Sequence, residues 1–254
     1  PNIYKREEIF RQEGWNYHLE QKEGPLKYNG VVYNEMKGAF SSPDEVLERE
    51  IMNHLFPDTT YGCESGGDPK NIPDLTYENF LNFHRKFYHP SNSFIYLYGN
   101  MDMEEKLAFL DEHYLSHFDY LDVDSVIQEQ KAFGACRDVT LEYPVAENEG
   151  EEDYTYLSYN MVVGNAADSQ MAMAFEVLDY ALLSAPGAPL KQALLDVKAG
   201  KDVYGSYDDG ILQPYFTVIA KGSNPDRKEE FVSVIRQVLG DIVKNGIDRK
   251  AVEA

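Results

Sequence analysis

The run Gly30-Val31-Val32-Tyr33-Asn34-Glu35-Met36-Lys37-Gly38 places a single acidic residue, Glu35, at the centre of an apolar segment. A carboxylate is costly to bury in such surroundings unless a metal ion, a base or several hydrogen bonds accept it. The rest of the chain contains no His-x-x-Glu-His, no His-Glu-x-x-His and no cysteine cluster that could complete a metal site. Glu35 therefore indicates one part of an active site, carried on a piece of a larger protein.

Composition narrows the class of protein. A chain of 254 residues, 43% of them hydrophobic, is long enough for one large or two ordinary domains with a real core. The net charge of −21 argues against a nucleic-acid partner, because phosphate repels an acidic surface. It suits a cationic partner or substrate, or simply a solvated surface.

Targeting signals are scarce. No apolar run approaches the roughly 20 residues of a membrane span, so no membrane partner is expected. Two cysteines, Cys63 and Cys136, do not form a disulfide framework and suit a reducing compartment, for which we expect the cytoplasm. Because the chain begins at Pro1, without an initiator Met, we expect the native start to lie elsewhere.

Residues 1–120 read as helices with one strand. Ser42-Pro43-Asp44-Glu45 is a strong helix start, with Ser as the N-cap and Pro in the first turn. Thr76 and Asp102 are N-caps of two further helices. The strand is predicted at Phe94–Tyr98.

Residues 121–136 have little periodicity and are predicted to link the first domain to a second one, 137–254. The second domain reads as strand, helix, hairpin and helix, which is an α+β pattern. Its predicted elements are strands at Val139–Tyr143 and Tyr154–Val163, a helix capped by Asp168, a hairpin around Asp209-Gly210, a helix from Asn224-Pro225, and a last helix capped by Asp248 that the end of the chain cuts off.

Several ordered motifs together resemble the insulinase/pitrilysin family of zinc endopeptidases, in its presequence-protease (falcilysin-like) branch. They are Gln12-Glu13-Gly14-Trp15, Gly30 to Phe40, Ser65-Gly66-Gly67-Asp68-Pro69, Ile72-Pro73-Asp74-Leu75-Thr76, Phe83-His84, Tyr88-His89-Pro90-Ser91-Asn92, Ala188-Pro189-Leu190 and Asn245-Gly246-Ile247-Asp248. The resemblance implies two insulinase-like α+β units with antiparallel sheets and helices packed on one face, the first unit being incomplete here.

The same resemblance implies a zinc site. Members of the family carry an inverted motif, His-x-x-Glu-His, whose histidines bind zinc and whose Glu is the general base. By position in the family pattern, the third ligand is Glu35. Catalytic zinc takes three protein ligands and leaves one place for water, which suits this assignment. The motif would lie upstream of Pro1, so no catalytic residue is expected in this chain, and its substrate-binding residues stay undefined.

Other polar residues have competing interpretations. Tyr33, Asn34 and Lys37 could orient Glu35 or could be ordinary polar positions. His113 and His117 have a spacing that can chelate zinc, but they lack a Glu between them and are expected to be structural. The glycines in Ser65-Gly66-Gly67 have no P-loop lysine, so they predict tight turns or close backbone approach, not nucleotide binding.

We therefore expect a fragment of a zinc metalloendopeptidase that degrades short, unfolded and possibly cationic peptides through a zinc-activated water. Alone, the chain is expected to be inactive and to hold no zinc, and its natural partners are the N-terminal and C-terminal parts of the parent. The alternative is a non-catalytic peptide-binding or scaffold subunit of the same fold. The parent's upstream sequence separates the two, because an intact His-x-x-Glu-His favours the peptidase.

Overall fold

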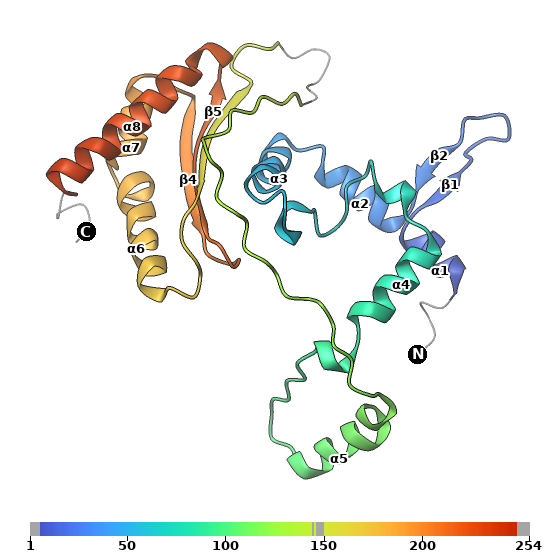
Figure 1. The fold of residues 1–254 in the computed structure, drawn as a ribbon. Coiled ribbons are helices and arrows are strands. Elements are labelled where there is room, and N and C mark those ends of the chain that lie inside the picture. The colour runs from blue at the N-terminus through green and yellow to red at the C-terminus, as the bar shows by residue number, and fades with distance from the viewer. Residues whose placement is uncertain (1–5, 144, 146–149, 248–254) are drawn as a thin grey trace. The chain divides into compact units, whose positions relative to one another are not determined.

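The computed structural model describes residues 6–143, 145 and 150–247 (Figure 1). Contacts divide the chain into a first unit, Pro1–Phe40 with Glu64–Ile127, and a second unit, Ser41–Cys63 with Gln128–Ala254. The expected first domain, in contrast, runs without a break to residue 120. The difference lies in helix α3, Pro43–Leu55, which packs against strands of the second unit.

The first unit combines helices with a small antiparallel hairpin. Its elements are α1 (Glu7–Glu13), β1 (Asn16–His18), β2 (Lys27–Asn29), α2 (Val31–Ala39), α4 (Tyr77–Phe87) and α5 (Met103–His113), with 3-10 turns at Ile72–Asp74, Pro90–Asn92 and Leu115–His117. In the hairpin Tyr17 lies opposite Tyr28. Phe10, Trp15 and Ile72 form a buried core, against which Tyr33 and Met36 of α2 pack. These contacts hold α2 in place through its inner face, the side of the helix that carries Tyr33 and Met36.

The strand predicted at Phe94–Tyr98 is wrong, because the structure forms neither helix nor strand there. Phe94, Tyr96 and Tyr98 are largely exposed. Their apolar, β-prone sequence is a local signal, whereas a strand also needs a partner for its backbone groups. No such partner strand is present among the described residues of this unit.

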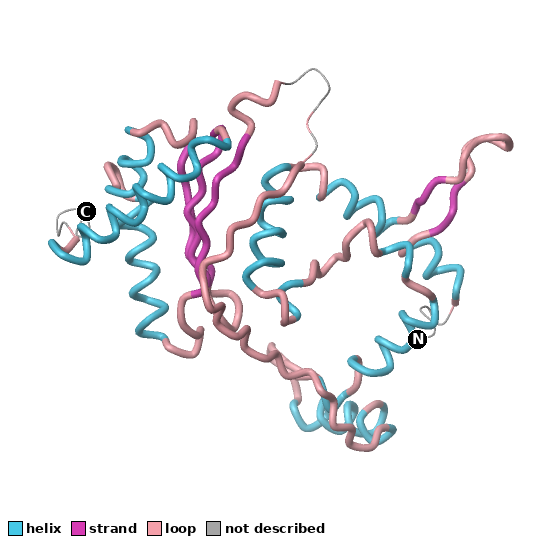
Figure 2. Tube along the Cα trace, turned by 45° about the horizontal axis from the view of Figure 1, so that its top comes forward, coloured by secondary structure: helices cyan, strands magenta, loops and turns pink. Residues whose placement is uncertain are grey.

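The second unit is a three-stranded antiparallel sheet in the order β3-β5-β4. Its elements are α3, a 3-10 turn (Thr60–Gly62), β3 (Thr155–Val162), α6 (Ser169–Asp179), a π-helical turn (Tyr180–Ser184), α7 (Pro189–Asp196), β4 (Asp202–Asp208), β5 (Tyr215–Ser223), a 3-10 turn (Pro225–Arg227) and α8 (Lys228–Asn245). Figure 2 shows the three strands side by side, with helices on either side. The predicted α+β class with antiparallel sheets is confirmed.

Alternate residues of the strands face two different helical layers. Val203, Val218 and Ala220 belong to the larger buried core, which α6, α7 and α8 cover. Tyr204 and Ile219, their immediate neighbours, pack instead with Ile51 and Leu55 of α3. Successive side chains of a strand point to opposite faces, so α3 covers the face that the other helices leave open.

Local helix signals are confirmed where a side chain caps the helix. The Asp168 carboxylate accepts from the main-chain nitrogen of Met171 at 3.0 Å and starts α6. The predicted hairpin forms as β4 and β5, although its connection runs over residues 209–214 and is longer than an Asp-Gly turn. The strand predicted at Val139–Tyr143 is wrong, since that segment is neither helix nor strand. The helix predicted after Asp248 lies outside the described residues.

Within the described part of the chain, none of the helices combines the length and apolar character that a membrane span requires.

Candidate metal-ligand site

Helix α2, which carries Glu35, starts at a glycine that no other residue could replace without strain. Gly30 has φ 146°, a conformation that L side chains rarely adopt. A Cβ there would lie 2.3 Å from the carbonyl oxygen of Gly14. That same oxygen accepts a hydrogen bond from the main-chain nitrogen of Tyr33 at 3.2 Å. The close approach of the two chain segments fixes where α2 begins.

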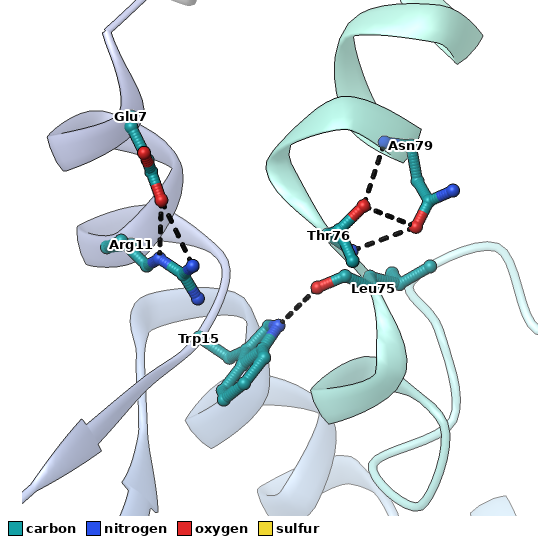
Figure 3. Close-up of polar contacts among 6 residues, drawn as sticks. All are labelled: Glu7, Arg11, Trp15, Leu75, Thr76 and Asn79. Atoms are coloured by element: carbon teal, nitrogen blue, oxygen red, sulfur yellow. Dashed lines mark hydrogen bonds and ion pairs between the residues drawn. The ribbon is translucent and has the colours of Figure 1, made fainter.

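A second glycine holds the inner face of α2. A Cβ on Gly66 would lie 2.2 Å from the sulfur of Met36, so the absence of a side chain at Gly66 leaves the space that the Met36 side chain fills. Gly66 lies in the loop before α4. Trp15 ties this loop to the core, because its indole nitrogen donates to the carbonyl oxygen of Leu75 at 2.8 Å (Figure 3).

Glu35 itself is exposed, so the expectation of a carboxylate inside an apolar environment is wrong. The apolar residues before it are split by the helix between two faces. Tyr33 and Met36 point into the core, while Val31 and Val32 are 52% and 36% exposed. At helical spacing, Val31 and Val32 lie on the same side as Glu35. The outer face of α2 is thus an apolar surface with one carboxylate.

The outer face offers a carboxylate with no competing partner. Among the described residues, no hydrogen bond or ion pair engages Glu35. Asn34 is already engaged, since its side-chain nitrogen donates to the side-chain oxygen of Asn29 at 2.9 Å. Tyr33 packs inward, and Lys37 is exposed. A role for Asn34 or Lys37 in orienting Glu35 stays a prediction.

Carboxylate oxygen is an ordinary zinc ligand, so Glu35 fits one place in a zinc site. Among the described residues, no group of three or more His, Cys, Asp or Glu side chains is arranged so that it could hold a metal ion. The ring of His113 instead lies 4.6 Å from that of Phe109, centroid to centroid. Gly30 was missed as a residue that positions α2, because a glycine carries no chemistry in the sequence and shows its purpose only through contacts. The close backbone approach predicted for the glycines of Ser65-Gly66-Gly67 is found at Gly66, beside Met36.

A model of one protein family, described as the peptidase M16 inactive domain, matches residues 74–254. The chain belongs to the M16 peptidase family. The matched range covers most of the chain but not Glu35, which lies before it. The resemblance to zinc endopeptidases of the presequence-protease type is therefore confirmed at the level of the family.

Two relatives match almost the whole chain. HypA of Clostridium perfringens is 51% identical over 254 residues, 100% of this chain and 26% of that protein. Presequence protease 1, chloroplastic/mitochondrial, of Arabidopsis thaliana is 37% identical over 249 residues, 96% of this chain and 23% of that protein. The chain thus spans about a quarter of the length of these relatives.

Solved structures support the fold. A putative M16-like peptidase from Alicyclobacillus acidocaldarius aligns with a TM-score of 0.55 and 19% identity, over 88% of this chain and 52% of that chain. A peptidase M16 inactive domain from Pseudomonas fluorescens aligns with a TM-score of 0.54 and 19% identity, over 87% and 53%. At this identity the likeness concerns the fold alone.

Proposed function

We propose that this chain supplies Glu35 as one zinc ligand of an M16 metalloendopeptidase that hydrolyses peptides. The observation that carries the proposal is the exposed, unengaged carboxylate on the outer face of α2. A solvated glutamate needs no apolar neighbours, yet Val31 and Val32 remain exposed beside this one. Such a surface suits contact with further polypeptide that brings the remaining ligands.

Rigid support of the ligand is the contribution that this chain makes. Metal sites need ligands held close to their productive geometry by packing beneath them. Gly30 fixes where α2 begins. Gly66 leaves room for the Met36 side chain, which packs the inner face of α2 against the loop before α4. When bound, zinc supplies Lewis acidity that polarises a peptide carbonyl and lowers the pKa of water. The general base would come from outside this chain.

The test uses the parent polypeptide, purified with its metal. Glu35→Gln keeps the size of the side chain but removes its charge and one ligand oxygen. We expect zinc affinity, measured by competition with a chelator, to fall by more than about 100-fold, because even loss of a residue that only supports a ligand costs 10–100-fold. The matched control is Glu104→Gln, an exposed acid on α5. Equal zinc affinity in both variants would refute the assignment.

A second candidate is a non-catalytic subunit that binds peptides or serves as a scaffold. The observation that favours it is the family model itself, which is described as an inactive domain and covers 74–254. The two candidates differ in metal content. A parent polypeptide that binds peptides, yet contains no zinc and cleaves none of them, would establish the second candidate and exclude the first.

We infer that the substrates are short, unfolded peptides, with cationic ones preferred. A net charge of −21 raises the local concentration of cationic peptides and speeds their encounter with the protein. Salt screens such attraction over about 8–10 Å at physiological ionic strength. In the parent enzyme, KM for a cationic peptide should therefore rise with salt, while KM for a neutral peptide of equal length should not. A KM unaffected by salt for both peptides contradicts this preference.

The free, exposed cysteines Cys63 and Cys136 support a reducing compartment, and we propose the cytoplasm. Fractionation of the source cells, followed by detection of the protein in each fraction, tests this placement.

A further inference from the structure

The hairpin of β1 and β2 in the first unit has one apolar and one polar face. Tyr17 lies directly opposite Tyr28, and Leu19 and Leu26 are the next residues of the same parity, just beyond the strands. Successive side chains of a strand point to opposite faces, so these four residues share one face, which we call the hairpin face. The other side of the ribbon carries the polar side chains of Asn16, His18, Lys27 and Asn29.

The hairpin face is open to water. Tyr17 and Tyr28 are 60% and 46% exposed, and Leu19 and Leu26 are exposed as well. The two tyrosine rings lie against each other at 5.5 Å between centroids, and the buried ring of Trp15 meets both of them edge-on at one end. An isolated two-stranded ribbon is only marginally stable unless its apolar face packs against something. The exposed face is therefore a candidate binding surface.

A carboxylate lies beside this face. Interaction with Tyr17 is the largest cause that raises the pKa of Tyr28, and the negative charge of Asp74 adds to it, which places Asp74 near the Tyr28 hydroxyl. The next residue after Asp74 is Leu75, whose carbonyl oxygen accepts the hydrogen bond from Trp15 (Figure 3). The Asp74 side chain is exposed, and among the described residues no hydrogen bond or ion pair engages it.

These groups together suit a ligand that is both apolar and cationic. The faces of tyrosine rings attract ammonium and guanidinium groups, and a carboxylate forms charge-assisted hydrogen bonds with them. Lys and Arg side chains can lay their aliphatic stems along apolar surface while the charged head stays in water. The net charge of −21 also attracts cations toward the protein from a distance. Charge complementarity therefore favours a basic, amphipathic peptide on the hairpin face.

The hairpin face lies close to the candidate metal ligand. Gly30 alone separates β2 from α2, and the ring of Tyr28 lies 5.8 Å from that of Tyr33 in α2, centroid to centroid. The three residue steps from Tyr28 to Val31 span at most about 10 Å, and four helical steps to Glu35 add about 6 Å. A peptide bound at Glu35 therefore reaches the hairpin face within about five extended residues.

We propose that the hairpin face binds a basic, amphipathic segment of the peptide substrate. The stem of an Arg or Lys side chain lies on the rings of Tyr17 and Tyr28, and its charged head bonds to the carboxylate of Asp74. Apolar side chains next to it in the peptide contact Leu19 and Leu26. The inference rests on the proposed peptidase function, and it assigns the preference for cationic peptides to named residues.

The test measures peptide binding to the full chain in the absence of zinc, by fluorescence anisotropy of a labelled peptide in which Leu and Arg alternate. A second peptide carries citrulline, which is neutral and similar in shape, in place of each Arg. We expect the double variant Tyr17→Leu, Tyr28→Leu to bind the arginine peptide about 3- to 10-fold more weakly, the range of an exposed cation–π contact. Asp74→Asn should weaken the arginine peptide similarly and leave the citrulline peptide unchanged.

The matched controls are Tyr120→Leu and Asp111→Asn, which remove the same groups from exposed positions outside the hairpin and should bind both peptides as the parent does. Circular dichroism checks that each variant is folded. Equal affinity of the parent and the hairpin variants for the arginine peptide overturns the proposal, and so does an equal loss for both peptides in Asp74→Asn.

A second copy of the chain is the competing occupant of the hairpin face. Sedimentation that shows a dimer, lost in the double tyrosine variant, together with absence of peptide binding, would also overturn the proposal. Because the binding assay contains no zinc, such a result leaves the assignment of Glu35 standing. Conversely, a zinc affinity that Glu35→Gln does not change would leave the binding result in place.

Discussion

The indole nitrogen of Trp15 donates to the main-chain carbonyl oxygen of Leu75 at 2.8 Å, across 60 residues of chain (Figure 3). Trp15 is 8% exposed and is the only tryptophan of the sequence. It packs in the same core as Tyr33 and Met36, the inner residues of α2. Indole emission therefore reports on the packing that supports the candidate metal-ligand helix, without interference from the second unit.

Gly30→Ala should disrupt this packing. The new methyl group would meet the main chain of Gly14 and Trp15, at 2.3 Å from the nearest oxygen, and φ 146° would be strained. Backbone cannot yield as a side chain does, so we expect a loss of at least about 2–3 kcal/mol in unfolding free energy. Urea titration followed by Trp15 emission measures it.

The control for this variant is Gly38→Ala, in the same helix. A Cβ at Gly38 would meet no atom within 4 Å, and alanine favours helix more than glycine does. The unfolding free energy from urea titration should stay level or rise by up to about 1 kcal/mol. Equal losses in the two variants would show that the contact with Gly14 does not fix α2.

Thr76→Ala should destabilise the start of α4. It should thereby also weaken the hydrogen bond that the Trp15 indole donates to the Leu75 carbonyl oxygen. The Thr76 hydroxyl accepts a hydrogen bond from the main-chain nitrogen of Asn79 at 3.1 Å. In return, the side-chain oxygen of Asn79 accepts a hydrogen bond from the main-chain nitrogen of Thr76 at 3.0 Å. Loss of such an N-cap costs about 1 kcal/mol. Urea titration by Trp15 emission should show this loss, whereas Thr76→Ser, which keeps the hydroxyl, should lie close to the parent.

Sequence signals were sufficient wherever the cause of a structure is local. Thr76, Asp102 and Asp168 each cap the helix that their sequence predicts, because the capping bond spans only three residues. The three-residue strands β1 and β2 were missed, since so short a stretch shows no period of two.

Contacts between segments that lie far apart in the chain could not be predicted from the sequence. Helix α3 was correctly predicted from Ser42-Pro43, yet its packing on the sheet depends on Ile219, far away in the chain. The pattern of 30–38 identified Glu35 but not its exposure, because an apolar run that folds as a helix presents two different faces. The metal-ligand role rested on family resemblance and still awaits its test.

Acid should loosen α3 from the sheet. The Lys221 ammonium nitrogen lies 2.8 Å from Oδ2 of Asp44, and this hydrogen bond lowers the pKa of the carboxyl below its usual range. A lowered folded-state pKa contributes stability above about pH 4, the unfolded value, which is lost as pH falls through the folded value. The pair is half exposed, so the loss should not exceed about 1 kcal/mol. Unfolding free energies from pH 6 down to pH 3 should fall less steeply in Asp44→Asn than in the parent, and parallel curves would contradict the coupling.

Alkali should act on two partly buried tyrosines that pack against α3, Tyr204 and Tyr215. Burial, assisted by the nearby carboxylates of Asp44 and Asp208, raises the pKa of Tyr204 and of Tyr215 to about 12. The unfolded chain loses these protons near pH 10, so stability is complete below about pH 10 and falls between 10 and 12. In the double variant Tyr204→Phe, Tyr215→Phe, the decline of the urea midpoint over this range should be shallower. The same decline in both proteins would assign it to other groups.

Close packing between β4 and β5 predicts the largest effect in the second unit. A Cβ on Gly205 would lie 2.1 Å from the carbonyl oxygen of Thr217 and 2.6 Å from Cδ1 of Leu183. Gly205→Ala must separate the strands or displace the π-helical turn, and we expect it to cost at least about 3 kcal/mol. Gly240→Ala, within α8, is the matched control, since its Cβ meets no atom within 4 Å and helix propensity favours it by about 0.5–1 kcal/mol. The midpoint temperature of thermal unfolding, followed by far-ultraviolet circular dichroism, should therefore fall in Gly205→Ala and rise in Gly240→Ala. A shift of the same sign in both variants would mean that β4 does not pack at Gly205 as described.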